Sequence, residues 1–118
     1  MTKYLPLFPL SIVVFPGEKL NLHVFEPRYK QLVLECIEND VTFGIPTYIQ
    51  DGVGLFGTEM KLLNIEKKHP NGEMDIRTQA LGIFKILRFD RMAPGRLYAG
   101  GEVEMVKNKD DEDIIVKL

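Results

Sequence analysis

Residues 52–57 carry the spacing of a dinucleotide-binding loop, Gly-Val-Gly-Leu-Phe-Gly. Such a loop holds a pyrophosphate only where it follows a strand and begins a helix, because the helix N-terminus supplies backbone donors and a positive dipole end. An extended segment precedes the loop, and Asp75 follows at about the spacing of a ribose-binding carboxylate. However, Thr58–Lys67 alternates as a strand does, and Asn71-Gly72 predicts a hairpin turn before Asp75. We therefore predict a glycine-rich connection at 50–57 and no cofactor site.

The one cysteine and the two histidines offer little for catalysis or metal binding. A reactive thiolate needs a cation beside it, whereas Cys36 falls on the apolar face of a predicted helix, so we predict a buried thiol. His23 falls on the polar face of a predicted strand, and His69 falls in a predicted turn. Neither has Cys, Asp or Glu at the spacing typical of metal ligands, so we predict no metal site.

The remaining candidates for chemistry are a serine and an acidic run. Ser11 is the only serine and has no base beside it, and the chain contains no phosphate-binding G-x-x-x-x-G-K-[ST] motif. The carboxylates at 110–113 lack the alternation and central glycine of a calcium loop, so we interpret them as solvated charge. The sequence thus predicts a protein that is not an enzyme.

The composition is that of an ordinary single domain. A chain of 118 residues can bury one core without metal or disulfide support. Its net charge of −2 disfavours nucleic-acid binding, which usually requires a basic surplus. A single cysteine fits a reducing compartment, prolines interrupt the early apolar run, and no run reaches the roughly 18 apolar residues of a membrane span. We predict a cytoplasmic protein without a membrane segment.

The elements that must position these residues begin with Leu5–Leu34. Pro6 and Pro9 cannot donate to a sheet ladder, so the first extended segment should lie at an edge or carry a bulge. Lys19–Val24 alternates as a half-buried strand, and Pro27 suits the first turn of a helix. The predicted helix covers about 27–39, ends at Asn39-Asp40, and presents an apolar face made of Tyr29, Leu32, Val33, Cys36 and Ile37.

The rest of the chain is predicted to form strands. The pattern in Thr58–Lys67 shifts phase between Leu62 and Leu63, as a β-bulge would require, and Gly82 is expected to break a later strand. The expected strands are Val41–Ile49, Thr58–Lys67, Met74–Ala80, Ile83–Phe89 and Leu97–Val106. We predict a mainly β (α+β) fold, a small curved barrel of about six strands with one amphipathic helix.

Several short motifs, taken in order, resemble the N-terminal (substrate-binding) domain of Lon proteases. Residues 5–29 resemble the opening of that domain through three motifs in order: Leu-Pro-Leu-Phe-Pro-Leu, Phe-Pro-Gly and Phe-Glu-Pro-Arg-Tyr. Phe-Gly-Thr, Pro-Asn-Gly and Ala-Leu-Gly-Ile-Phe-Lys-Ile follow within residues 56–86 at similar spacing. The resemblance covers roughly residues 4–106.

The resemblance implies a PUA-like pseudobarrel that recognises protein or peptide segments without catalysis, through apolar contacts and sheet-edge pairing. It also implies that residues 1–118 are a single domain, namely the barrel part without the family's C-terminal helices, either cut at a boundary or naturally short. In this family, the protease part works through a serine and a lysine, and the motor part works through a phosphate-binding loop. The sequence resembles neither part, so the resemblance implies recognition without catalysis. No cofactor is expected. Whether a protease or an ATPase acts with the chain stays open.

The alternative function is RNA binding, because PUA-like barrels in other families bind RNA. It would require a cationic face with stacking aromatic side chains. The densest cationic stretches are Lys67-Lys68 and a series interrupted by Asp90, which consists of Lys85, Arg88, Arg91 and Arg96. We expect nucleic acid not to be the partner.

Four apolar residues are candidates for contact with a bound protein segment. Leu34 departs from the apolar stripe of the helix and should point partly outward. Val53, Leu55 and Phe56 fall in the predicted glycine-rich loop, where exposure would favour binding. The structural alternative is that Leu55 and Phe56 close the end of the barrel.

Two charged candidates flank Pro27. Glu26 and Arg28 could face a bound segment. In the structural interpretation, Glu26 caps the helix start and Arg28 pairs with a carboxylate elsewhere on the barrel.

The tail differs from the barrel. Lys107–Asp113 is strongly charged, and Ile114–Leu118 resumes an apolar pattern. We predict that the chain self-associates through this apolar end.

Overall fold

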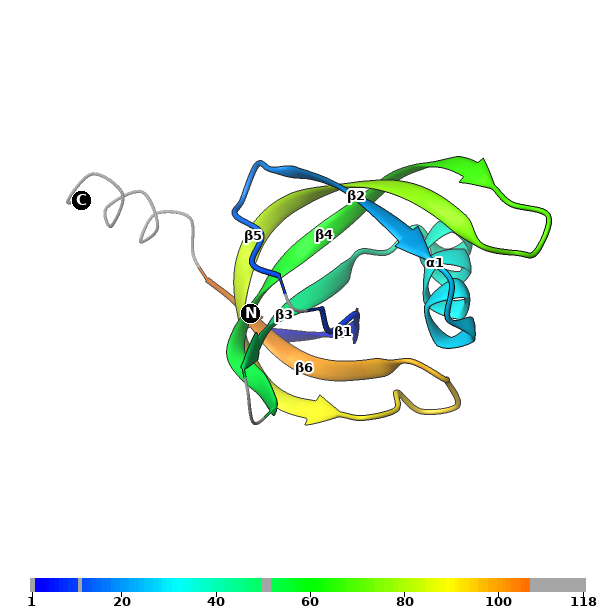
Figure 1. Cartoon of the computed structure of the whole chain (residues 1–118). Helices are drawn as coiled ribbons and strands as arrows, with labels where there is room; N and C mark the ends of the chain where they lie inside the picture. Colours follow the sequence, from blue (N-terminus) through cyan, green and yellow to red (C-terminus); the bar gives the residue numbers. More distant parts are fainter. Residues whose placement is uncertain (1, 11, 50–51, 107–118) are drawn as a thin grey trace.

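The computed structural model describes residues 2–10, 12–49 and 52–106, and only the backbone of 48–49 and 52–55 (Figure 1). Its elements are β1 (Thr2–Leu7), β2 (Lys19–Val24), α1 (Pro27–Asn39), β3 (Phe43–Ile49), β4 (Gly52–Lys68), β5 (Met74–Asp90) and β6 (Ala99–Met105). The predicted mainly β fold, with six strands and a helix at 27–39, is confirmed. Within the described residues, no helix combines the length and the apolar character that crossing a membrane requires.

Strand β5 organises the sheet because it changes partner along its length. It pairs with β4 from Met74 to Lys85, with β2 along its first half and with β6 along its second half. The order β2-β5-β4-β3-β1-β6 therefore returns to β5, and the strands curve into a ring with α1 at one side (Figure 1). The predicted small barrel is observed in this form.

The prediction that the first strand lies at an edge or carries a bulge is confirmed where Pro6 lies, because among the described residues the segment 2–6 has a strand partner only on the β6 side. Strand β1 lies between β3 and β6, pairing antiparallel with β6 from Thr2 to Leu7. It meets β3 at one paired position, Leu7–Gly44. The proline is tolerated because Pro6 belongs to one continuous ladder and interrupts no second one.

The predicted glycine-rich connection at 50–57 is wrong for its larger part, because β4 begins at Gly52 and pairs with β3. The physical reason is an aromatic ring elsewhere in the chain. A Cβ on Gly57 would lie 2.6 Å from the ring of Phe84, and one on Gly44 would lie 2.7 Å from it. These glycines let two strands approach a buried ring rather than form a loop.

The expected break at Gly82 is also wrong, because β5 is continuous there and β4 and β5 instead slip in register. Glu59 pairs with Gly82, whereas Met60 pairs with Ala80, so Leu81 is an extra residue. A second slip confirms the predicted bulge: Leu62 pairs with Thr78 and Asn64 with Arg77, which leaves Leu63 without a partner position.

The helix packs Tyr29, Leu32, Val33 and Cys36 into the larger of two apolar clusters. Its C-terminus is closed by Asp40, whose backbone adopts the left-handed conformation (φ 53°) and whose N–H reaches the carbonyls of Cys36 and Ile37. Ile37, predicted on the buried face, is half-exposed. The smaller cluster surrounds Phe84 inside the ring and contains Leu5, Leu7, Ile86, Ala99 and Val103.

Candidate protein-binding groove between the helix and strand β4

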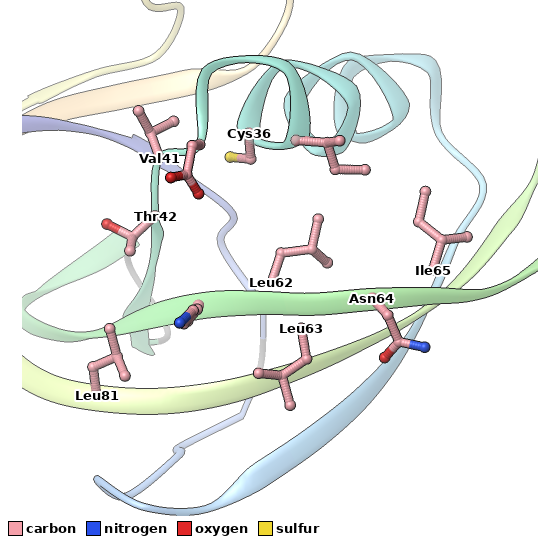
Figure 2. Close-up of a pocket in the computed structure, with 11 residues that line it drawn as sticks. Cys36, Val41, Thr42, Leu62, Leu63, Asn64, Ile65 and Leu81 are labelled. Carbon is pink, nitrogen blue, oxygen red and sulfur yellow. The ribbon is translucent and has the colours of Figure 1, made fainter.

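A groove of about 640 Å³ lies between the end of α1 and the middle of β4. Its walls come from the helix end, the segment leading into β3, β4 and β5 (Figure 2). Four apolar side chains that line it are 39–47% exposed, namely Ile37, Val41, Leu63 and Leu81. This volume falls in the range of roughly 300–1,000 Å³ that small-ligand sites occupy, and its apolar lining suits side chains of a bound segment.

The two bulges place the leucines of the groove. Leu63 and Leu81 are the extra residues at two of the three register slips of the β4–β5 pair. A bulge leaves one residue without a partner position in the ladder and bends the strand there. In Figure 2, Leu62 extends from β4 towards the helix, whereas Leu63 extends to the other side of the strand. Leu62 packs against the larger core cluster, whereas Leu63 is exposed on the opposite side of β4.

The backbone beside this groove is an open sheet edge. Strand β3 begins at Phe43, which pairs with Met60, so β3 covers β4 only up to that residue. Among the described residues, Lys61–Lys68 has a strand neighbour only on the β5 side. An edge of this kind presents unpaired N–H and C=O groups that another chain can pair with.

The thiol that lines the groove, that of Cys36, is buried and protonated. Burial first, then the charge of Glu35, raises the pKa of this thiol to about 12. Its thiolate is therefore absent at neutral pH, which confirms the predicted core thiol. In the described part of the chain, the one group of metal-ligating side chains (His23, His69 and Asp75) lies outside the groove.

A polar clamp holds α1 against the loop before β6. Glu35 accepts hydrogen bonds from Tyr98 and from Arg96, at 2.5 Å and 2.8 Å. Gln31 accepts one from the backbone N–H of Leu97 at 2.8 Å. Burial, followed by the bond to Glu35, raises the pKa of Tyr98 to about 12. The clamp fixes the helix that forms one wall of the groove.

The charged candidates lie together but away from the groove. Glu26 occupies the N-cap position without a side-chain cap, and its carboxylate pairs with Arg28 at 2.9 Å. The expectation that Arg28 pairs elsewhere on the barrel is therefore wrong, because a carboxylate two residues away is within reach. With exposed Phe25, both residues line a smaller pocket of about 190 Å³.

The apolar candidates are not gathered into one surface. Leu34 is half-exposed on α1, and Phe56 is half-exposed on β4 opposite Lys85. Phe56 precedes the groove segment by five residues, or about 16 Å along a strand. Val53 and Leu55 lie in β4 instead of a loop, and their side chains fall outside the described residues.

Sequence reasoning missed the groove residues themselves. The phase shift in its strand could have indicated that Leu63 is exposed, but this shift is interpreted above only as a bulge. The position of Leu81 next to Gly82 is a weaker indication of the same kind. Ile37 and Val41 had none, because they are exposed only where the helix end overhangs the open edge of β4.

The comparisons with known proteins agree with this fold. The model of the ATP-dependent protease La (LON) substrate-binding domain matches residues 4–117. A Lon N-terminal domain protein from Xanthomonas campestris is 30% identical with a TM-score of 0.77, over 89% of this chain and 60% of that one. The N-terminal domain of Mycobacterium avium complex Lon protease, 14% identical, shares the fold with a TM-score of 0.71, over 89% of this chain and 55% of that one.

Two curated proteins are also similar. Cereblon from Xenopus tropicalis is 28% identical over 97 residues, and cereblon from Gallus gallus 25% over 96. Each match covers 77% of this chain and 22% of that protein, so the chain spans about a fifth of the length of these relatives. Because the family match covers nearly the whole sequence, the chain belongs to the Lon substrate-binding domain family.

Proposed function

We propose that this domain binds extended segments of other proteins without catalysis, by adding the segment as a strand to the open edge of β4. The observation that carries the proposal is the unpaired edge at Lys61–Lys68 beside a groove lined with exposed apolar side chains. Backbone hydrogen bonds would provide affinity that tolerates many sequences. Ile37, Val41 and Leu63 would select apolar side chains.

The family supports a protein as the ligand. Its description names a substrate-binding domain of an ATP-dependent protease, and the substrate of a protease is a protein. An extended, unfolded segment fits an edge strand, because its backbone groups are not yet paired. We also propose that the domain works in the cytoplasm, since its single thiol, Cys36, suits a reducing compartment.

RNA binding has weaker support. Of the cationic series considered for it, Arg88 pairs with Asp90 and Glu102, and Arg96 pairs with Glu35. Charges that are already paired attract phosphate less strongly, and the net charge of the chain is −2. We therefore propose protein as the partner.

The test is a peptide array of unfolded protein sequences, followed by fluorescence anisotropy with the tightest peptide. Leu63→Asp should weaken binding about tenfold or more, a loss of ~1.4 kcal/mol, because it puts a charge among the apolar side chains of the groove. Leu87→Asp is the matched control. Leu87 is also exposed, and it lies at a register slip between β5 and β6, outside the groove.

A second measurement tests the strand-addition geometry. The same peptide with alternate backbone amides N-methylated should lose binding in one of the two alternation phases, because only one phase faces the β4 edge. Equal affinity of both methylated peptides would contradict strand addition. If Leu34→Asp or Phe56→Asp abolishes binding while Leu63→Asp does not, the residues predicted from the sequence form the site and the groove does not.

A further inference from the structure

Four polar side chains meet where β2 crosses the end of the β4–β5 hairpin. His23 Nδ1 lies 2.6 Å from one oxygen of Asp75, and His69 Nε2 lies 2.9 Å from the other. His23 Nε2 lies 2.8 Å from the Glu73 carboxylate. The two imidazole rings stand edge to face with centroids 5.4 Å apart. Both histidines of the chain are in this cluster, although 46 positions separate them (69 minus 23).

The backbone, and not the side chains alone, brings these groups together. His23 on β2 is directly opposite Asp75 on β5 in the antiparallel register. The hairpin turn is closed by hydrogen bonds from the N–H of His69 to the carbonyl of Glu73 and from the N–H of Gly72 to the carbonyl of His69. Gly72 has a φ of +91°, which glycine adopts without strain. The ligand atoms are therefore held near one another before anything binds.

We propose that this cluster binds one divalent transition-metal ion of the zinc class, through His23 Nδ1, His69 Nε2 and an oxygen of Asp75. Imidazole nitrogen with carboxylate oxygen is a donor set that Zn²⁺ accepts, whereas Mg²⁺ and Ca²⁺ prefer oxygen alone. Each of the three residues offers one ligand atom, and these three atoms all lie within 4.8 Å of one another. Ligand bonds of about 2.0–2.1 Å in a tetrahedron require donors about 3.3 Å apart, so the widest pair must close by roughly 1.5 Å through side-chain rotation.

Glu73 supports the site from outside. A histidine that binds a metal through one nitrogen commonly donates its other N–H to a carboxylate, which fixes the ring and its tautomer. The Glu73 carboxylate is placed to accept this hydrogen bond from the Nε2–H of His23. Glu73 is itself fixed by Asn71, whose side-chain amide donates to the carboxylate at 2.9 Å and whose side-chain oxygen accepts from the Glu73 N–H at 3.0 Å.

The site has open coordination positions. The side chains of His23 and Asp75 are 47% and 41% exposed, so three protein ligands leave room for water or for a group from a partner. The ring of exposed Phe25 stacks near His23, with centroids 6.2 Å apart. A bound ion would tie β2 to the hairpin turn on the side of α1 where Glu26 and Arg28 lie. This proposal is independent of peptide binding at the groove.

The experiment is calorimetric titration of the whole chain with Zn²⁺ alone after chelator treatment. One ion per chain is expected, and the melting temperature should rise with Zn²⁺ concentration because the ion binds the folded state. His69→Ala should abolish binding at this site, and Glu73→Gln should weaken it about 10- to 100-fold. Glu66→Gln, at an exposed ion pair with Arg77, is the control and should bind as the parent does.

Two outcomes would overturn the proposal. One is the absence of stoichiometric binding by the folded parent, which would mean that only protons hold the cluster together. The other is unchanged binding by the His23→Ala/His69→Ala double variant, which would place the ion elsewhere. If a histidine variant fails to fold, the parent is titrated with Co²⁺ instead. The expected result is a visible absorption spectrum typical of Co²⁺ with four nitrogen and oxygen ligands. A spectrum like that of octahedral, hydrated Co²⁺ would contradict the site.

Discussion

Both halves of strand β5 bury side chains, but they differ in how completely the strands around them are paired. The second half, which pairs with β6, belongs to a closed end of the barrel, where Phe84 is fully buried and glycines on neighbouring strands contact its ring. The first half, which pairs with β2, belongs to an open end, which we define as β2, α1, the free edge of β4 and the hairpin turn. The groove and the histidine cluster both lie at the open end.

This contrast suggests that one end of the sheet maintains the fold and the other end binds ligands. At the closed end, the strands are paired on both sides and leave little free backbone, so this end can hold the shape of the barrel but offers few partners to a ligand. At the open end, the register slip at Leu63 and the end of β3 leave apolar and backbone groups unpaired. A binding surface arises where strand pairing stops and leaves an edge free, provided that the fully paired part keeps the sheet folded.

The largest expected effect compares one buried and one exposed side chain across the two ends. Phe84→Ala should lower the free energy of unfolding by about 3–5 kcal/mol, because it opens a cavity in the smaller core cluster. Leu63→Ala should change it by no more than about 0.5 kcal/mol, because the side chain is already exposed to solvent. Urea unfolding of both variants checks this. Similar losses would show that Leu63 is as tightly packed as Phe84, and would contradict its assignment to an exposed groove.

A smaller effect tests why the glycine segment is a strand. Gly57→Ala should cost about 1–3 kcal/mol, because its Cβ would lie 2.6 Å from the Phe84 ring and 2.8 Å from the Ile45 carbonyl oxygen. Gly82→Ala is the control, since its nearest neighbour would be the Met105 methyl at 3.9 Å. Equal stability of the two variants would contradict the role assigned to Phe84.

These contacts also show what the sequence could predict. The helix at 27–39, the turn at 69–72 and the bulge at Leu63 were predictable, because each depends on residues within one turn or a few positions. The glycines at 52–57 were misread because Phe84, the reason for Gly57, is 27 positions further on (84 minus 57). The groove and the histidine pair depend on strand register, which local patterns alone do not determine.

A third prediction concerns the clamp that holds α1 at the open end. Tyr98 has an ordinary pKa near 10 when unfolded and about 12 when folded, mainly because it is buried and then because it donates to Glu35. The folded state keeps this proton while the unfolded state loses it, so the free energy of unfolding should fall as pH rises from about 10 to 12. Chemical denaturation across that range measures the fall.

Tyr98→Phe provides the matched comparison for this pH dependence. The fall should become shallower in the variant and should not vanish, because the pKa of Tyr4 is also raised to about 12, by partial desolvation and by its bond to Asp90. An identical pH profile would show that the clamp does not govern the alkaline transition. A loss of peptide binding by this variant at neutral pH would link the clamp to the groove wall.

The smallest effect on the folded barrel is expected from the tail, which follows the closed end after β6 ends at Met105. The apolar run Ile114–Leu118 predicts self-association, and these residues lie outside the described ones. Light scattering over a concentration series should give a rising mass for the whole chain and a constant mass for a variant ending at Val106. Both should unfold with nearly the same free energy, since the barrel pairing ends before the removed residues. A constant monomer mass for the whole chain would contradict the prediction and leave the interaction surfaces of this domain confined to its open end.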